Sequence, residues 1–408
     1  HHGWEKGVST GWDELDRFYT VRPGEFTVVT GIPNSGKALA LDTPIPTPSG
    51  WTTMGSLKVG DEVFDESGKR CKVTHAFDVL YNRPCYRVRF DDGSEIVADA
   101  EHLWVTRTEK ARRSAYQAMK KRGDREETQP HGTDQRWKRT YPSAVTTEEI
   151  ARTLHTKEGR LNHAVGVARP IECEAKALPI PPYTLGAWLG DGASACGAIT
   201  VADEEVLEAI RADGFSVTRM PSTKYGYTIT GLVRDLRAAG LIGNKHIPPV
   251  YLRGSIEQRK ALLAGLMDTD GYIGTDGRCE FCSTNETLAR HVFELVASLG
   301  MRPTLRTGIA SLNGTNHGPK YRVCFTPAFN PFRIQRKSAR FKTTGRARRI
   351  AYRKIVAVDP VSSVPVRCIR VDSPTHQFLA GHAFIPTHNS NWLDALLVNL
   401  ATLHGWNF

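Results

Sequence analysis

The sequence predicts a chain of two folded parts, in which an α+β domain interrupts an all-β domain. Two stretches near the ends, residues 38–106 and 336–389, are rich in strand-forming residues with Gly and Asp at turns, which is typical of an all-β domain. The middle stretch, 177–335, instead carries two similar apolar segments that each end in Asp-Gly, and each is followed by an amphipathic helical pattern. A third observation is that a phosphate-loop motif is split between the two flanks of the insert.

Composition limits the classes of function. With 408 residues the chain should hold two or three domains, and a net charge of +11 favours a polyanionic partner, most simply nucleic acid. No apolar run is long enough to predict a membrane span. Eight scattered cysteines argue against a disulfide framework and predict a reducing, cytoplasmic setting. We expect Cys279 and Cys282 to pack along a strand rather than to bind zinc.

The split motif begins with GIPNSGK, residues 31–37, which has Gly31, Gly36 and Lys37 at phosphate-loop spacing. The next position needs a Ser or Thr hydroxyl to bind Mg²⁺, but it holds Ala38. The missing hydroxyl is found at Ser390, which opens the helical pattern SNWLDALLVNLA. Joining Lys37 to Ser390 restores the order of strand, glycine-rich loop and helix that cradles phosphate. An insert at this position disrupts the nucleotide-binding loop of its host. The host could function only if the insert is removed from the translated protein.

The C-terminal end of the insert carries residues that can cleave the chain at that point. Asn389 can attack its own peptide carbonyl through its side-chain amide and cut the chain, and the neighbouring His388 can move the proton. The hydroxyl of Ser390 can accept the upstream segment as an ester, which then rearranges to an amide.

Residues 38–389 therefore resemble an intein. ALALDTPIPTPSGWTTMGSLKVGDEVF resembles the N-terminal splicing block, DDGSEIVADAEHLWVT the block with the catalytic His, and VRCIRVDSPTHQFLAGHAFIPTHN the two C-terminal blocks. The flanks resemble a DnaB-type, twinkle-like replicative helicase around its Walker A loop. The resemblance implies an all-β Hint (horseshoe) splicing domain between an N-extein, 1–37, and a C-extein, 390–408.

One departure identifies the type of intein. Most inteins begin with Cys or Ser, and this insert begins with Ala38. Trp104, Cys368 and Thr387 together resemble the signature of class 3 inteins, although each alone is also an ordinary core or strand residue.

The mechanism that this resemblance implies starts with attack of Cys368 on the carbonyl of Lys37. His102 would protonate the departing amine of Ala38, and Asp99 would orient His102, contact the junction or merely hold a turn. Ser390 would then take over the acyl group from the branched thioester. His376 and His388 would assist while Asn389 cyclises. Splicing needs no cofactor or metal, and after it Gly31, Gly36, Lys37 and Ser390 would form the nucleotide-binding loop of the host.

The middle of the insert resembles a LAGLIDADG homing endonuclease. LAGLMDTDG, residues 263–271, is a close copy of the motif, and TLGAWLGDG, 184–192, is a degenerate one, which implies a pseudo-twofold single-chain nuclease. Small residues (Gly186, Ala187, Ala264, Gly265) let two helices approach closely. Asp191 and Asp270 would then emerge side by side and bind Mg²⁺. Lys224 and Lys320, each in a Lys-Tyr pair of a strand-like stretch, are candidates for transition-state stabilisation. Lys245 matches a lysine of the family whose role stays open.

Between the first splicing segment and the nuclease lies a predicted basic linker or DNA-recognition insert, 107–176. Its first part, 107–139, is rich in Arg and Lys with little apolar periodicity, and is interpreted as a flexible segment that binds DNA phosphates or as a solvated loop. A short helix should begin near Thr146, which can form a capping box with Glu149.

The partners expected from this reading are double-stranded DNA and the flanking helicase exteins, and the chain should be a monomer. The alternative is a standalone LAGLIDADG DNA endonuclease or DNA-binding protein with an inactive splicing domain. A helicase-like ATPase is disfavoured, since 390–408 is too short to complete a nucleotide-binding core.

Overall fold

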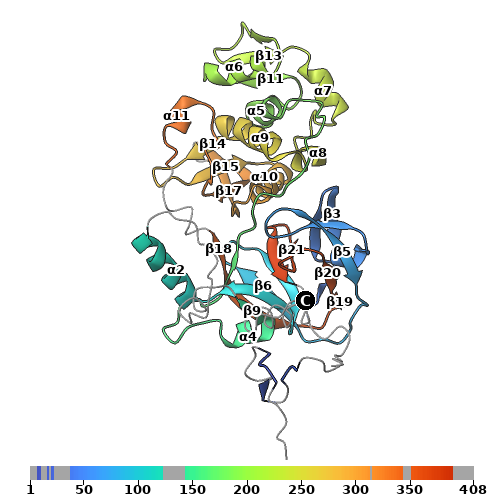
Figure 1. The fold of residues 1–408 in the computed structure, drawn as a ribbon. Helices are drawn as coiled ribbons and strands as arrows, with labels where there is room; N and C mark the ends of the chain where they lie inside the picture. Colours follow the sequence, from blue (N-terminus) through green and yellow to red (C-terminus); the bar gives the residue numbers. More distant parts are fainter. Residues whose placement is uncertain are drawn as a thin grey trace, which may run out of the picture.

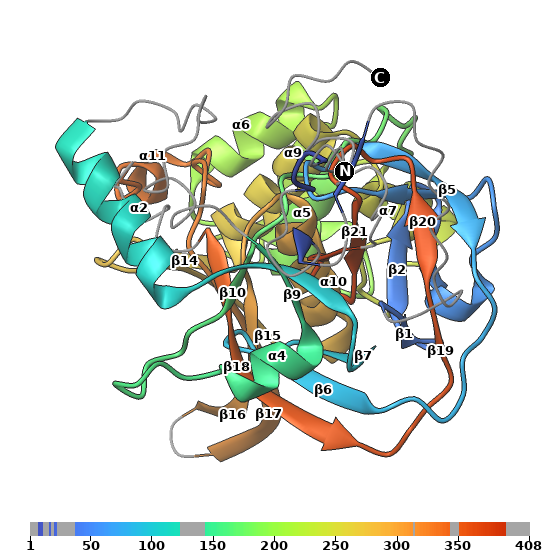
Figure 2. The same ribbon diagram turned by 60° about the horizontal axis from the view of Figure 1, so that its bottom comes forward.

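The computed structural model describes residues 7–10, 16–17, 20–22, 37–122, 143–312, 315–342 and 351–388. These form a lower lobe of mostly strands and an upper lobe of helices and strands (Figure 1). The chain builds part of the lower lobe, crosses to the upper lobe, and returns with its last strands, which lie beside the first ones in both ribbon views (Figure 2).

The lower lobe is built around a 10-stranded sheet with the order β19-β1-β7-β6-β18-β10-β8-β22-β21, in which β9 also pairs with β8. The strands of this sheet come from both ends of the described chain, which is what closes the lobe. They are β1 (Leu39–Ala40), β6 (Cys85–Phe90), β7 (Glu95–Asp99), β8 (Leu103–Arg107), β9 (Ser143–Thr146), β10 (Ala164–Gly166), β18 (Tyr352–Val361), β19 (Val366–Arg367), β21 (Gln377–Ala380) and β22 (Ile385–His388).

Two smaller sheets complete the lower lobe. One is the hairpin of β2 (Pro44–Thr47) and β3 (Gly50–Thr53), which a 3-10 turn at Met54–Ser56 follows. The other has the order β20-β5-β4, from β4 (Glu62–Phe64), β5 (Arg70–Ala76) and β20 (Ile369–Val371). A mostly-sheet lobe is therefore confirmed at both ends of the insert.

The segment 107–176 differs from its prediction. We expected a linker with a flexible basic part, 107–139. Strands β9 and β10 instead belong to the large sheet, the short helix α4 (Thr147–Arg152) packs against it, and residues 109–122 form the helix α2 (Glu109–Arg122). The rest of the basic part falls in 123–142, outside the described residues. Arg112 anchors α2 by donating hydrogen bonds to the carbonyls of Arg107, Asn162 and Leu161, at 2.6 to 3.0 Å. Long-range pairing thus orders a segment whose local apolar pattern is weak. The predicted cap at Thr146 is confirmed, since its side chain accepts the Glu149 N–H.

The upper lobe contains two sheets, with the orders β11-β13-β12 and β14-β15-β17-β16. Cys279 and Cys282 lie on one strand, as expected. The elements are α5 (Pro182–Asp191), β11 (Ala198–Thr200), α6 (Glu204–Ala212), β12 (Val217–Arg219), β13 (Gly226–Ile229), α7 (Leu232–Ala238), α8 (Pro249–Leu252), α9 (Ile256–Thr269), β14 (Gly271–Ile273), β15 (Cys279–Ser283), α10 (Glu286–Ser298), β16 (Thr304–Leu312), β17 (Thr315–Phe325) and α11 (Gln335–Ser338).

Helices α5 and α9 cross at the centre of the upper lobe, and glycine makes the approach possible. A Cβ added to Gly186 would lie 2.2 Å from the carbonyl oxygen of Leu262, and one added to Gly265 would lie 2.2 Å from that of Tyr183. Both distances are shorter than any van der Waals contact, so the two backbones touch where a side chain would separate them. The close helix pair predicted from the small residues is confirmed.

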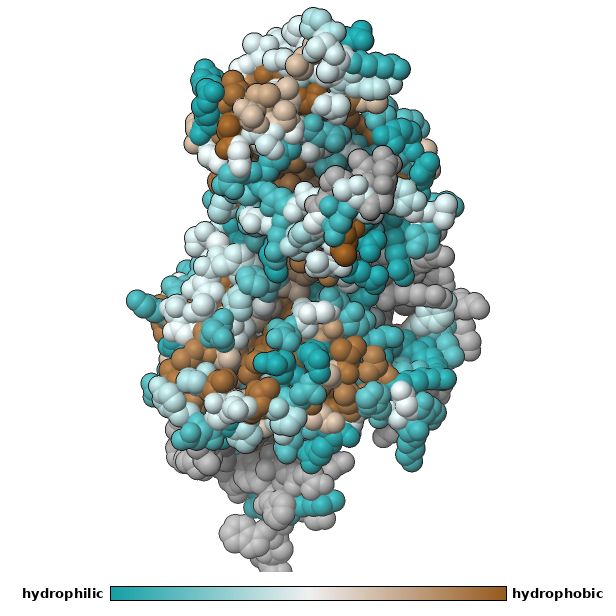
Figure 3. Space-filling view, turned by 180° about the vertical axis from the view of Figure 1, so that it is seen from behind, coloured by the Kyte–Doolittle hydropathy of each residue, from teal (hydrophilic) through white to brown (hydrophobic). Residues whose placement is uncertain are grey.

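Each lobe has its own apolar core, with Trp188 and Leu263 in the upper core and Trp104 and Ile355 in the lower. The surface seen from behind is mostly polar, with apolar residues in separate groups on both lobes (Figure 3). In the part of the chain that the structure describes, no helix is both long and apolar enough to cross a membrane.

Candidate functional site

The first site surrounds Ala38, at the start of the large sheet. Strand β1 pairs with β19 in antiparallel register, Leu39 with Arg367 and Ala40 with Val366. Continuing that register by one residue sets Ala38 opposite Cys368. On its other side β1 pairs with β7, and the Asp99 N–H donates a 2.9 Å hydrogen bond to the Ala38 carbonyl. Two strands from opposite ends of the insert therefore hold the junction between them.

Cys368 packs beside Ala38, Cys85 and Val366. Its Sγ donates a weak 3.4 Å hydrogen bond to the carbonyl of Ile369. Burial raises the pKa of the Cys368 thiol to about 11, and the ammonium of Lys37 acts in the opposite direction. At neutral pH the resting side chain is therefore a thiol, so a base must remove its proton before it can attack.

His102 is fully buried beside the same junction. Its Nε2 contacts the Thr387 hydroxyl, and the Trp104 ring meets its imidazole edge to face at 4.9 Å. Burial lowers the pKa of His102 to about 4, and the Lys37 backbone acts against this shift. The imidazole is thus neutral near pH 7, with one nitrogen able to accept a proton and the other to donate.

Trp104 is held in turn by Thr147, a residue that sequence reasoning missed. The indole Nε1 donates to the Thr147 hydroxyl at 3.0 Å, and that hydroxyl donates to the His102 carbonyl at 3.1 Å. These two hydrogen bonds together fix the rings of Trp104 and His102. No local signal marks Thr147, which also reads as the start of a helix.

Lys37, the residue before the junction, adopts a φ of 108°. A non-glycine residue pays a steric cost in this left-handed region, so the peptide next to Ala38 is strained. Burial lowers the pKa of the Lys37 ammonium, while the nearby Cys368 and Glu101 act in the opposite direction.

Asp99 supports the turn before His102. Its carboxylate accepts a 2.8 Å hydrogen bond from Arg83 Nε and one of 2.8 Å from the Glu101 N–H, while its carbonyl accepts the His102 N–H at 3.0 Å. Of the three roles left open, the side chain holds the turn and the backbone contacts the junction.

His376 and His388 lie at the base of the β21–β22 hairpin, with ring centroids 6.4 Å apart. His388 also pairs with Leu103, next to His102. Burial, followed by the charges of His376 and Lys37, lowers the pKa of His388 to about 4. The structure thus brings both histidines to the side of the hairpin where the chain continues to Asn389. Four predicted residues lie outside the described ranges: Gly31, Gly36, Asn389 and Ser390.

The second site lies where α5 and α9 end. Asp191 is the last residue of α5, Asp270 caps α9, and their carboxyl groups lie close enough to influence each other's protonation. Burial, and then the charge of Asp191, raises the pKa of Asp270 to about 6, and burial raises that of Asp191. Two neighbouring carboxyls that repel one another, one half-buried and one on an exposed residue, are a donor set that a divalent cation would satisfy. Among the described residues no third His, Cys, Asp or Glu joins them, and Mg²⁺ sites often use only one or two carboxylates with substrate phosphates.

Two lysines, Lys245 and Lys337, lie near the Asp191–Asp270 pair. They are not the two lysines that were predicted to act there. Lys245 Nζ donates to the carbonyls of Leu189, Gly190 and Gly192 at 2.7 to 3.1 Å, and Lys337 Nζ to those of Met267, Asp268 and Thr269 at 2.7 to 3.0 Å. Each ammonium therefore caps the helix that ends in one aspartate, and both act to lower the pKa of Asp270.

Lys224 and Lys320 lie elsewhere. Lys224 precedes β13 in an exposed turn, over the Tyr225 ring at 5.0 Å, so its strand prediction is wrong. Lys320 is on β17 as predicted, with its stem beside Gly308 of the neighbouring strand.

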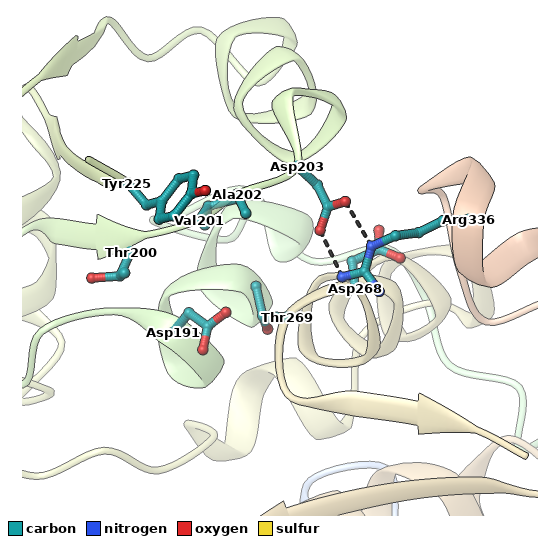
Figure 4. Close-up of a pocket in the computed structure, with 9 residues that line it drawn as sticks. All are labelled: Asp191, Thr200, Val201, Ala202, Asp203, Tyr225, Asp268, Thr269 and Arg336. Atoms are coloured by element: carbon teal, nitrogen blue, oxygen red, sulfur yellow. Dashed lines mark hydrogen bonds and ion pairs between the residues drawn. The ribbon is translucent and has the colours of Figure 1, made fainter.

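A cavity of about 230 Å³ opens on one side of Asp191 (Figure 4). Arg336 closes its rim by a two-pronged ion pair with Asp203, at 2.7 Å for both contacts. The cavity is lined by Asp191, Thr200, Val201, Ala202, Asp203, Tyr225, Asp268, Thr269 and Arg336.

Comparison with known proteins supports the middle of the chain most directly. Residues 257–326 match the family described as LAGLIDADG-like domain, so the chain contains such a domain. The chain is 44% identical over 369 residues to a replicative DNA helicase DnaB of Mycobacterium intracellulare, over 89% of this chain and 60% of that protein. It therefore spans less than two thirds of that relative.

Two further matches concern the flanks and the solved structures. A stretch of 41 residues is 68% identical to a chloroplastic/mitochondrial Twinkle homolog of Arabidopsis thaliana, over 10% of this chain and 6% of that protein. Among solved structures, the MchDnaB-1 intein aligns at 19% identity over 86% of this chain and 100% of that chain, with a TM-score of 0.28.

Proposed function

We propose that this chain is a precursor that excises residues 38–389 by class 3 protein splicing and joins Lys37 to Ser390. The observation that carries the proposal is the β1–β19 register, which aligns Ala38 with Cys368. The buried contacts of His102 with Thr387 and Trp104 support it, because they link the other two signature positions to the histidine beside this junction. The long match to a DnaB helicase supports the proposed host.

In the proposed first step, the Cys368 sulfur forms a thioester with the Lys37 carbonyl while the bond from that carbonyl to the Ala38 nitrogen breaks. Neutral His102 accepts the proton that the thiol loses and delivers it to the departing nitrogen, so the step balances without an external acid. Release of the strained Lys37 conformation favours the same direction.

The later steps use residues outside the described ranges. Ser390 takes the acyl group from Cys368 as an ester, and Asn389 cyclises to a succinimide and frees the insert. His376 and His388 move protons at this junction, and the ester then rearranges to the Lys37–Ser390 amide. The joined product completes the Walker A loop of a DnaB-type, ATP-binding host helicase, with Gly31, Gly36, Lys37 and Ser390 as its phosphate-binding residues.

We further propose that the LAGLIDADG-like domain is a homing endonuclease for double-stranded DNA, with two pseudo-twofold halves that begin at α5 and α9. The shared strand order of β11-β13-β12 and β15-β17-β16 supports this internal repeat. Both halves lie in one chain, so the nuclease works as a monomer.

Asp191 and Asp270 would hold Mg²⁺, which supplies an activated water and neutralises phosphate charge when bound. Lys245 and Lys337, rather than Lys224 and Lys320, supply positive charge that acts on Asp270, from their positions at the ends of α5 and α9.

The splicing proposal is tested by replacing Cys368 with Ala and following products by intact mass. Wild type should release the insert and yield the joined flanks, and Cys368→Ala should leave the Lys37–Ala38 bond intact. Cys85→Ala is the matched control, because that thiol packs in the same cluster without facing Ala38 in the register. Release of the N-terminal flank by Cys368→Ala would refute the direct attack. The alternative, a standalone nuclease with an inactive splicing domain, predicts no joined flanks from wild type.

A further inference from the structure

One of the contacts between the two lobes is made by a buried arginine. Arg253 follows α8 of the upper lobe and is 3% exposed. Its Nη1 donates to Glu294 of α10 at 2.7 Å, which holds one nitrogen of the guanidinium in the upper lobe. Figure 1 shows α8 directly above the β2–β3 hairpin of the lower lobe.

The rest of the guanidinium enters the lower lobe. Arg253 Nε donates to the Thr47 carbonyl at 2.9 Å, and Nη2 donates to that of Gly50 at 3.3 Å. The same group lies 5.4 Å from the Trp51 ring centroid and 6.0 Å from that of Phe384. Trp51 and Phe384 meet edge to face at 5.3 Å, so the cation closes a three-membered cluster.

Phe384 connects this cluster to the junction. It adopts a φ of 53° in the turn between β21 and β22, a conformation that needs support from its surroundings. The Phe384 N–H donates to the Gly381 carbonyl at 3.0 Å, and the Gly381 N–H donates to Pro44 of β2 at 2.7 Å. From this turn β22 runs directly to Thr387, which contacts His102.

We propose that Arg253 is a positioning residue for splicing, through which the upper lobe holds the β21–β22 turn and thereby the Thr387 contact on His102. The inference rests on the splicing function proposed above. The inserted domain would therefore contribute to splicing, because replacing its arginine loosens a turn of the splicing domain.

Replacing Arg253 should affect only the few groups that its side chain contacts. Replacing Arg253 removes two donors to the β2–β3 turn and the cation that lies beside the two rings, and it leaves Glu294 without its buried partner. Arg253→Met with Glu294→Gln removes that unpaired charge, so the pair of substitutions tests the contact with the hairpin rather than a buried carboxylate.

The matched control is Arg302, which also joins the lobes. Arg302 Nη1 donates to both carboxylate oxygens of Asp91, at 2.8 and 2.9 Å, in the turn between β6 and β7 rather than at the β21–β22 hairpin. Arg302→Met should therefore weaken the lobe contact without releasing Phe384.

The experiment measures thioester formation in the full chain, with Asn389→Ala to stop later steps, as a function of pH. We expect Arg253→Met/Glu294→Gln to slow the step about tenfold, against less than about twofold for Arg302→Met. Once the turn loosens, water reaches His102, which also faces Lys37, Asp99 and His388, so the acid limb of the rate profile should move to higher pH. A general loss of stability would lower the yield of active protein without moving that limb.

Equal rates and an unmoved acid limb for the Arg253 variant would overturn the inference. The same series with Cys368→Ala separates the two proposals. If Cys368→Ala still releases the N-terminal flank at the rate of wild type, the splicing mechanism is wrong; if release is blocked while the Arg253 variant behaves as wild type, only the positioning role is wrong.

Discussion

The hydroxyl of Thr387 links the two ends of the insert at the scale of a single residue. Thr387→Val keeps the shape of the side chain but removes the oxygen that His102 Nε2 contacts. We expect thioester formation to slow about tenfold or more, because the imidazole loses the partner that fixes its orientation. The measurement is the rate of release of the N-terminal flank.

Thr375→Val is the control for that change. Its exposed hydroxyl donates to Glu66 at 2.8 Å, and it precedes the same hairpin. If both threonine variants slow the reaction equally, the effect comes from the hairpin and not from the His102 contact.

The thiol of Cys368 carries a second prediction. Because burial raises its pKa to about 11, the thiolate fraction grows up to about tenfold for each pH unit below that value. In the proposed step, however, neutral His102 takes this proton during the attack, so the rate of flank release should change little from about pH 6 to about pH 9. Stopped reactions analysed by mass across this range check the prediction. A rate that rises about tenfold per pH unit would mean that solvent, and not His102, removes the proton from the thiol.

At the scale of elements, the α5–α9 pair depends on two glycines. A Cβ on Gly265 would lie 2.2 Å from the Tyr183 carbonyl oxygen and 2.6 Å from the Ala187 nitrogen, both backbone atoms that cannot turn away. Gly265→Ala should therefore force the helices apart and destabilise the upper lobe by about 1 to 3 kcal/mol. It should also separate Asp191 from Asp270 and abolish DNA cleavage.

Gly308→Ala is the matched control within the same lobe. A Cβ there would meet only the Lys320 side chain, at 3.6 Å, which is an ordinary contact. Denaturant unfolding and cleavage of DNA that encodes the joined flanks would measure both variants. Normal cleavage by Gly265→Ala would show that the helix crossing does not set the carboxylate pair.

The same elements show what sequence can predict. The close crossing of α5 and α9 follows from small residues within each segment, so it could be predicted locally. The caps at Thr146 and at Asn285, which accepts the Leu288 N–H, follow from local rules as well. The position of Cys368 beside Ala38 came instead from the resemblance, because no local pattern pairs strands so far apart.

What could not be predicted depends on contacts between distant segments. Lys337 reads as one basic residue among many, and only the fold brings its ammonium to the end of α9. The role of Thr147 could not be predicted for the same reason, since its hydroxyl acts by accepting a hydrogen bond from the distant Trp104. The pairing of β9 with β8 likewise orders a stretch whose composition favoured a linker.

At the scale of the whole molecule, the two lobes are joined by polar contacts and by a small apolar cluster, in which Ala297 of α10 packs with Phe64, Leu379 and Phe384 of the lower lobe. Arg253 and Arg302 cross between the lobes, and Arg259 donates from α9 to the carbonyl of Ile171 in the segment that connects the lobes. The hydrogen bonds of the two buried arginines, Arg253 and Arg259, fix geometry more than they add stability. The lobes should therefore keep a defined orientation, and the two main cores, which lie in different lobes, should differ in how solvent conditions change their stability.

Acid should accordingly destabilise the lower lobe first. Burial lowers the pKa of His102, His163 and His388 to about 4, and these residues all lie in that lobe. Between about pH 6.5 and about pH 4 the unfolded chain binds protons that the folded chain does not, so each histidine removes up to about 1.4 kcal/mol of stability per pH unit as pH falls. This stabilising contribution is fully present above about pH 6.5.

In the upper lobe Asp270 acts in the other direction, because its pKa is raised to about 6 and protonation relieves its repulsion with Asp191. Thermal unfolding followed from about pH 7 to about pH 5 should show the lower lobe losing stability faster than the upper lobe. His163→Gln tests the cause, since His163 bonds only to Thr106, Thr153 and Asn162 among the described side chains and lies outside the proposed chemistry. This variant should flatten the pH dependence of the lower transition, and an unchanged slope would mean that buried neutral histidine does not set it.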